Sequence, residues 1–137
     1  MVSPRRGNLR TVSGFLGSLL LILGFILLVP LLFVFLFRGQ AESGRTLAAF
    51  VIPSILSLGS GFALRRWAGQ AEPNITQAML ICALAWLILS AFGALPYVIG
   101  IQAGYIDAYF ETMSGFTTTG ITMFTGLDSM PGSIIFY

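Results

Sequence analysis

Three stretches of this chain carry no charged side chain, and each is long enough to cross a lipid bilayer. They are residues 12–37, 46–64 and 77–100. A helix of about 20 apolar residues covers the roughly 30 Å of hydrocarbon in a bilayer. Only 9% of the 137 residues are charged and 56% are hydrophobic, so a polar shell around one core cannot be built. The sequence therefore predicts an all-α integral membrane protein with three transmembrane helices.

The first of these stretches is longer than a bilayer requires. It spans 26 residues, and Pro30 lies in its second half. We expect this helix to tilt, to bend near Pro30, or both. A cleavable signal peptide is the alternative, because three arginines precede the stretch. Its apolar run exceeds the roughly 7 to 15 residues of a signal peptide, so we expect the segment to be retained.

The arginines predict the orientation of the helices in the membrane. Arginine and lysine are enriched in cytoplasmic loops, and this chain has seven arginines and no lysine. Five belong to one side of the predicted membrane and two to the other. The five are Arg5, Arg6, Arg10, Arg65 and Arg66, and the two are Arg38 and Arg45. We therefore expect a cytoplasmic amino terminus, and we expect the residues after Gly100 to lie at the external face.

Composition excludes several classes of function. The net charge of +2 is small and no basic stripe is interleaved with aromatic residues, so nucleic acid is not an expected partner. The chain has no histidine, the commonest general base and metal ligand. Cys82 is the single cysteine, and within an apolar run it is most simply a small buried hydrophobe.

Several shorter features have structural interpretations. Small residues in the first two stretches predict close helix packing, with a hinge as the alternative. They are Ser13, Gly14, Gly17, Ser18, Gly24, Ser57, Gly59, Ser60 and Gly61. Pro96 predicts a kink or an end near the outer part of the third helix. Asn74-Ile75-Thr76 spells a glycosylation acceptor on the predicted cytoplasmic side, where we interpret it as chance.

Residues 107–115 predict a short helix after the third span. We expect Asp107 to cap this helix and Glu111 to lie one turn later, with both acids near its positive end. About nine residues cover roughly half a membrane, so a helix entering from outside would end near the midplane. Its carboxyl end carries partial negative charge and favours a cation there. Gly115 is expected to let the helix stop.

The next segment is poor in helix formers, namely Phe116-Thr117-Thr118-Thr119-Gly120-Ile121-Thr122. Extended backbone at membrane depth is tolerated where it lines an ion-filled path, because carbonyl oxygens can replace the hydration shell of a cation. An ordinary outer loop is the alternative, since threonine and glycine are common between helices. The order of the segments favours the ion path: outward helix, acidic half-helix, Thr-Thr-Thr-Gly, a turn, and an apolar restart at Ile134.

Four motifs in this order resemble the Trk-type potassium uptake proteins of the TrkH family. They are Gly93-Ala94-Leu95-Pro96-Tyr97, Asp107-Ala108-Tyr109-Phe110-Glu111, Ser114-Gly115-Phe116-Thr117-Thr118-Thr119-Gly120 and Gly126-Leu127-Asp128-Ser129-Met130-Pro131. The resemblance covers essentially the whole chain and matches the amino-terminal part of such a transporter. It implies a leading two-helix membrane domain at residues 1–70 and a first pore repeat at residues 71–137, truncated after the selectivity loop.

The resemblance also implies roles for individual residues. Backbone carbonyls of Thr118, Thr119, Gly120 and Ile121 would bind potassium in the filter, with the Thr118 hydroxyl at its inner end. The supporting residues would be Gly115, Thr117 and Thr122. A glycine at position 120 accompanies potassium selectivity in this superfamily, whereas serine accompanies sodium permeation in plant relatives.

At the level of the assembly, the resemblance implies a bacterial inner membrane protein that transports potassium and has no enzymatic activity or cofactor. Members carry four helix, pore-loop, helix repeats around one path, pair as a homodimer of the full-length subunit, and bind a cytoplasmic nucleotide-binding regulatory subunit of the TrkA type. This chain holds one incomplete repeat, so we expect either a fragment of a longer product or assembly with other chains.

Two other functions remain as alternatives. An accessory membrane subunit could pack against other membrane proteins through its glycine-rich helices without conducting ions. An intramembrane protease could pair Asp107 with Asp128, but both acids fall in predicted interfacial segments. Ser114 has no histidine or lysine to activate it as a nucleophile.

Overall fold

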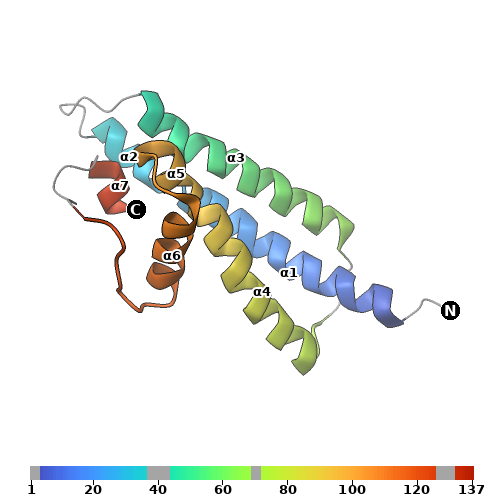
Figure 1. The fold of residues 1–137 in the computed structure, drawn as a ribbon. Helices are drawn as coiled ribbons and strands as arrows, with labels where there is room; N and C mark the ends of the chain where they lie inside the picture. Colours follow the sequence, from blue (N-terminus) through green and yellow to red (C-terminus); the bar gives the residue numbers. More distant parts are fainter. Residues whose placement is uncertain (1–3, 37–43, 69–71, 126–131) are drawn as a thin grey trace.

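The computed structural model describes residues 4–36, 44–68, 72–125 and 132–137, and within these ranges every regular element is a helix (Figure 1). The helices are α1 (Pro4–Ile26), α2 (Val29–Leu36), α3 (Gly44–Trp67), α4 (Ile75–Gly93), α5 (Leu95–Ile101), α6 (Tyr105–Phe116) and α7 (Gly132–Phe136). Three segments are long and apolar enough to cross a membrane: Leu9–Leu32, Gly44–Trp67 and Ile75–Ile101. They contain most of each predicted stretch, so the all-α, multi-pass prediction is confirmed.

The first span bends where the sequence predicts it. The helix ends at Ile26, a turn covers Leu27 and Leu28, and α2 begins at Val29. The Leu31 amide of α2 donates to the carbonyl oxygen of Leu28 in the turn over 3.1 Å. Pro30 is the second residue of α2, where its missing amide hydrogen costs little. The proline is therefore compatible with the first turn of α2, directly after the bend.

The helices α1 and α3 lie side by side and antiparallel over most of their length (Figure 1). Small residues line this contact: a β-carbon on Gly24 would lie 2.6 Å from Leu58 Cγ, and one on Gly14 would lie 2.7 Å from Ala68 Cβ. The Ser57 hydroxyl donates to the Leu20 carbonyl oxygen of the other helix over 2.8 Å. Close helix packing, rather than a hinge, is therefore the role of the small residues at this contact.

The helix α4 crosses α1 and packs against it through apolar side chains. Val12 and Leu16 of α1 are buried with Ile81 of α4. At the start of α4, the Asn74 side chain accepts from the Gln77 amide over 2.9 Å. The Gln77 side chain in turn accepts from the Asn74 amide over 2.9 Å, which completes a capping box. Asn74 therefore has a structural role as a helix cap.

A kink separates α4 from α5 at Ala94. The Ala94 amide still bonds to the Ser90 carbonyl oxygen at 2.9 Å, and the Val98 amide bonds to the Ala94 carbonyl oxygen at 3.2 Å. Pro96 is fully buried at the second position of α5. The predicted effect of this proline is thus a kink within a continuous span. The segment ends at Gln102, which has a left-handed backbone with φ 56°.

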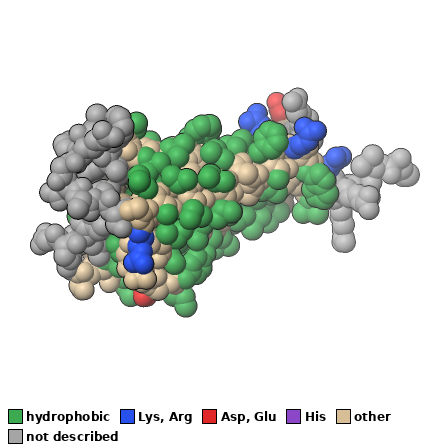
Figure 2. All heavy atoms as spheres, turned by 90° about the horizontal axis from the view of Figure 1, so that it is seen from above, with side chains coloured by type: hydrophobic (Ala, Val, Ile, Leu, Met, Phe, Trp, Pro, Cys, Tyr) green, Lys and Arg blue, Asp and Glu red, His purple; other side chains and the backbone are tan. Residues whose placement is uncertain are grey.

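The sides of the molecule are mainly apolar, and basic side chains occur towards its ends (Figure 2). Arg10, Arg65 and Arg66 are exposed at the end where α1 begins and α3 stops, and Arg45 is exposed near the opposite end. The Arg10 Nε atom donates to the Trp67 carbonyl oxygen over 3.2 Å. An apolar surface with charges at its ends suits a protein whose middle faces lipid.

Cys82 corrects one expectation from the sequence. Its side chain is exposed on α4 instead of being buried. In a membrane helix, apolar composition does not identify the inward face, because the outer face contacts lipid and is apolar too. Periodicity alone could not place this residue.

Candidate functional site

The short helix α6 is anchored to α4 by two tyrosines. The Tyr105 hydroxyl donates to the Ala91 carbonyl oxygen and the Tyr109 hydroxyl to the Leu87 carbonyl oxygen, each over 3.3 Å. At 1.5 Å per residue, the 12 residues of α6 extend about 18 Å, roughly half of a bilayer's hydrocarbon thickness. Its length therefore matches the half-membrane helix that the sequence predicts.

The amino-terminal cap of α6 differs from the prediction. The cap is Gly104, and no side chain accepts a hydrogen bond there. Asp107 lies in the first turn, where its charge still interacts favourably with the positive end of the helix. The prediction that Asp107 is the cap was wrong because the helix begins two residues earlier, at Tyr105.

The carboxyl end of α6 also differs from the prediction. The helix passes through Gly115, and the residue with a left-handed backbone is Thr118, with φ 55°. The Thr118 amide bonds to the Gly115 carbonyl oxygen at 3.1 Å, and the Thr117 hydroxyl bonds to the Met113 carbonyl oxygen at 2.8 Å. These hydrogen bonds satisfy carbonyl oxygens that have no partner within the helix. Thr118 thus occupies the left-handed position after the helix end, which is usually glycine.

Beyond Thr118 the backbone turns back and runs along α6. The Thr119 amide donates to the Ser114 carbonyl oxygen over 2.9 Å. The Ile121 amide donates to the Ser114 hydroxyl oxygen over 2.9 Å, and the Met123 amide donates to Glu111 Oε2 over 2.8 Å. Residues 119–125 have neither helix nor strand. Of the predicted segment 116–122, Phe116 belongs to α6, Thr117 and Thr118 form a turn, and the residues from Thr119 on have no regular structure. Alternate amides hold this irregular part against α6.

This pattern sets the direction of the carbonyl groups. A trans peptide is planar, so the carbonyl of one residue points opposite to the amide hydrogen of the next. The described residues contain no cis peptide. Because three alternate amides donate to α6, the carbonyls of Thr118, Gly120 and Thr122 point away from it. These carbonyl oxygens place partial negative charge on the side of the loop that faces away from α6.

The predicted filter residues Thr118, Thr119, Gly120 and Ile121 form the middle of this loop. All four residues are exposed to the surroundings of the described chain. Gly120 has φ 70°, and a β-carbon built on it would meet nothing within 4 Å. Glycine is therefore favoured here by backbone conformation and not by lack of space.

The predicted supporting residues have different roles. The Thr117 hydroxyl lies 2.9 Å from the Thr119 hydroxyl, so these side chains bond to each other at the base of the loop. The Thr122 hydroxyl accepts from the Phe124 amide over 3.1 Å. Gly115 is exposed on α6, and a β-carbon there would meet nothing within 4 Å. The structure therefore gives Thr117 and Thr122 contacts with the loop, and shows no close contact that requires glycine at position 115.

Sequence reasoning missed two residues that hold the loop, Ser114 and Glu111. It assigned Glu111 to the helix dipole, considered Ser114 as a nucleophile without a base, and otherwise gave both residues only as members of family motifs. Their spacing of three positions, which places them on one face of a helix, is the signal that could have identified them.

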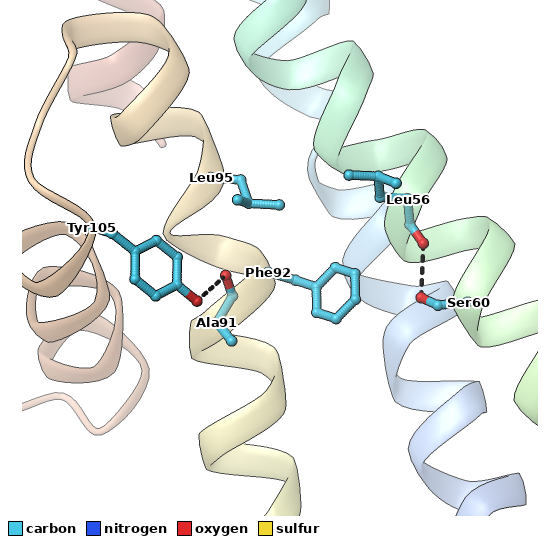
Figure 3. A pocket seen from close by; sticks show the side chains of 6 residues that line it. All are labelled: Leu56, Ser60, Ala91, Phe92, Leu95 and Tyr105. Carbon is cyan, nitrogen blue, oxygen red and sulfur yellow. Dashed lines mark hydrogen bonds between the residues drawn. The ribbon is translucent and has the colours of Figure 1, made fainter.

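A second feature is an apolar groove of about 350 Å³ between α3 and the α4–α5 segment. It is lined by Leu56, Ser60, Ala91, Phe92, Leu95 and Tyr105 (Figure 3). Its two hydroxyl groups are bonded to backbone: Ser60 to the Leu56 carbonyl oxygen at 2.7 Å, and Tyr105 to that of Ala91. The groove therefore offers little to replace an ion's hydration shell, unlike the loop.

The alternative of a protease site pairs Asp107 with Asp128. Among the described residues, no group of three or more histidine, cysteine or acidic side chains could hold a metal. Asp107 lies in the first turn of α6. Its proposed partner, Asp128, lies outside the described residues.

These features define a class: a multi-pass, all-helical membrane protein with a half-membrane helix followed by a loop that turns back along it. No family model matches the sequence. The chain is 32% identical over 132 residues to the Trk system potassium uptake protein TrkH of Escherichia coli K12, and 34% identical over 134 residues to TrkH of Halomonas elongata. Each alignment covers 95% of this chain and 27% of the relative.

An uncharacterized cation transporter of Methanocaldococcus jannaschii is 35% identical over 123 residues, which is 89% of this chain and 25% of that protein. The chain is therefore homologous to TrkH-type potassium uptake proteins, and the predicted resemblance is confirmed. It spans about a quarter of the length of these relatives. By their names these relatives are transport proteins and not enzymes.

Proposed function

We propose that this chain contributes one filter loop to a potassium-conducting path, as the amino-terminal part of a Trk-type uptake transporter. The observation that carries the proposal is the alternation in the loop: amides at positions 119, 121 and 123 donate to α6. This directs the carbonyls of Thr118 and Gly120, two of the four proposed ligands, away from α6, together with the carbonyl of Thr122. The names of the relatives support potassium as the ion.

The chemistry of the loop suits a cation that must bind weakly and move on. Potassium would exchange its hydration shell for backbone carbonyls of Thr118, Thr119, Gly120 and Ile121 and for neutral threonine hydroxyls. These ligands carry no full charge that would trap the ion. In this proposal Gly115, Thr117 and Thr122 support the filter.

The remaining parts of the proposal concern the whole transporter. Residues 1–70 would form a leading two-helix domain and residues 71–137 the first pore repeat. The complete subunit would form a homodimer in a bacterial inner membrane and bind a nucleotide-binding regulatory subunit of the TrkA type. Three exposed arginines at one end of the described chain, against one near the other, support a cytoplasmic amino terminus.

The first test compares potassium uptake by this 137-residue chain with uptake by a gene product extended past Tyr137. Both are expressed in an uptake-deficient bacterial strain growing on low potassium. We expect only the extended form to restore growth, because one loop cannot enclose an ion. Rescue by the short chain would instead mean that several copies assemble one pore.

The second test addresses the filter itself. Gly120→Ser in the extended product is expected to lower the ratio of potassium to sodium uptake. Gly59→Ser is the matched control, because Gly59 lies on α3 and a β-carbon there would also meet nothing within 4 Å. Unchanged selectivity in Gly120→Ser would refute the filter assignment.

An accessory subunit that only packs against other membrane proteins is the alternative. Small residues can bring membrane helices together, and in this chain those of α1 and α3 meet each other. A packing subunit should tolerate serine at position 120, so the same variant separates the two functions.

A further inference from the structure

Two side chains of α6 reach the loop and bond to its backbone. The Ser114 hydroxyl oxygen accepts from the Ile121 amide at 2.9 Å, and Glu111 Oε2 accepts from the Met123 amide at 2.8 Å. Ser114 is 6% exposed and Glu111 is half-buried. Both acceptors lie on one face of α6, three residues apart.

We propose that Ser114 and Glu111 form a two-point clamp on the loop backbone, which positions the carbonyl of Gly120 in the proposed filter and that of Thr122 beside it, and thereby contributes to the selection of potassium over sodium. This inference rests on the proposed function of the loop. Both are positioning residues: they act through the peptide groups, and the ion does not touch them.

The physical argument starts from the planar peptide. Holding the amide of Ile121 fixes the carbonyl of Gly120 in the opposite direction, and holding the amide of Met123 fixes that of Thr122. If an acceptor is removed, the amide loses this partner and the peptide can rotate. Selectivity depends on the positions or the number of the carbonyl ligands, and a loosened loop can contract around the smaller sodium ion.

Glu111 brings a charge as well as an acceptor, and the two effects can be separated. Gln retains a side-chain oxygen that can accept from Met123 but carries no charge. Ala removes both. A clamp predicts that Gln preserves selectivity, whereas a purely electrostatic role predicts that Gln and Ala behave alike.

The experiment measures potassium and sodium uptake by the extended gene product carrying Glu111→Ala or Glu111→Gln. We expect the potassium-to-sodium ratio to fall about tenfold in Glu111→Ala, in keeping with the loss of one hydrogen bond, and to stay near the parent value in Glu111→Gln, which keeps the acceptor. Asp107→Asn is the control for charge, because Asp107 lies on the same helix in its first turn.

Ser114→Ala provides a second variant with a smaller structural change. Its control is Thr112→Val, since Thr112 is also a buried hydroxyl of α6 but bonds within its own helix to the Ala108 carbonyl oxygen at 2.8 Å. We expect Ser114→Ala to lower the ratio several-fold and Thr112→Val to leave it unchanged.

Each outcome is decisive for the clamp. Equal loss in Glu111→Gln and Glu111→Ala would overturn it, as would unchanged selectivity in both Glu111→Ala and Ser114→Ala. If Gly120→Ser alters selectivity while the clamp variants do not, only this inference fails. If Gly120→Ser has no effect, the proposed filter itself fails.

Discussion

Gly17 of α1 and Gly61 of α3 approach so closely that a β-carbon on either would lie 2.7 Å from the carbonyl oxygen of the other. A backbone contact of this kind is possible only between residues without side chains. It brings two long helices together in lipid, where apolar burial supplies no extra drive between them. The contact predicts the effects of substitutions along α3.

Gly61→Ala is expected to destabilise the protein by about 1 to 3 kcal/mol, because the added methyl group must push two backbones apart. Gly59→Ala, two residues away and open to its surroundings, should have little effect or raise stability slightly. The thermal unfolding midpoints of both variants in detergent would be compared. Equal midpoints would contradict the predicted backbone contact.

Ser57→Ala should cost about 0.6 kcal/mol, the average measured for hydrogen bonds between membrane helices, because it removes the bond to the Leu20 carbonyl oxygen. Ser60→Ala is the control: the Ser60 hydroxyl bonds to carbonyl oxygens of its own helix. Denaturant titration would show a lower midpoint for the first variant than for the second. The reverse order would place the stabilising contact elsewhere.

Gly93→Ala should disturb the packing beneath the loop. Its β-carbon would lie 2.6 Å from Thr112 Cγ2 and 2.8 Å from the Tyr137 hydroxyl, which itself donates to the Gly93 carbonyl oxygen over 3.0 Å. We expect a loss of about 1 to 3 kcal/mol together with reduced uptake by the extended product.

Tyr137→Phe separates the loss of the Tyr137 hydrogen bond from the steric clash at Gly93. It removes only the hydrogen bond, so its cost should be about 1 kcal/mol. Thermal unfolding and uptake would be measured for both variants. A milder effect from Gly93→Ala than from Tyr137→Phe would show that the clash is relieved without cost.

Asn74→Ala should destabilise α4 by about 1 kcal/mol, because it removes the acceptor that caps the Gln77 amide. Asn74→Ser retains an acceptor at this position and should recover most of the loss. Serine also abolishes the glycosylation motif, so a recovery by serine would confirm that the cap and not the motif matters. Thermal unfolding of the three forms provides the measurement.

The main framework of the fold could be predicted from the sequence because it depends on long-range averages. Uncharged runs identified the three spans, Pro30 marked the first bend, and Pro96 marked the kink near the outer end of the third. Which small residues meet was not predictable. Gly17 meets Gly61, whereas Gly59 meets nothing, and this depends on the rotation of each helix about its axis.

The sequence predicted which segment forms the loop, but it did not predict which side chains hold that loop in place. The threonine and glycine content of residues 116–122 predicted extended backbone. Residues 119–125 have no regular structure, but Phe116 is helical and Gly120 has φ 70°, so the segment is irregular and not uniformly extended. The partners of Glu111 and Ser114 could not be identified, because their bonds form only once the chain reverses direction. The left-handed backbone at Thr118 was likewise hidden, since β-branched residues rarely adopt it.

The return of the loop along its own helix has an evolutionary consequence. The hydrogen bonds from the amides of Thr119, Ile121 and Met123 to α6 join residues no more than 12 positions apart in the chain. A segment shaped largely by its own neighbours can be copied within a gene and keep its form in a new place. The helix and loop therefore have the properties of a unit from which a larger protein can be assembled by duplication.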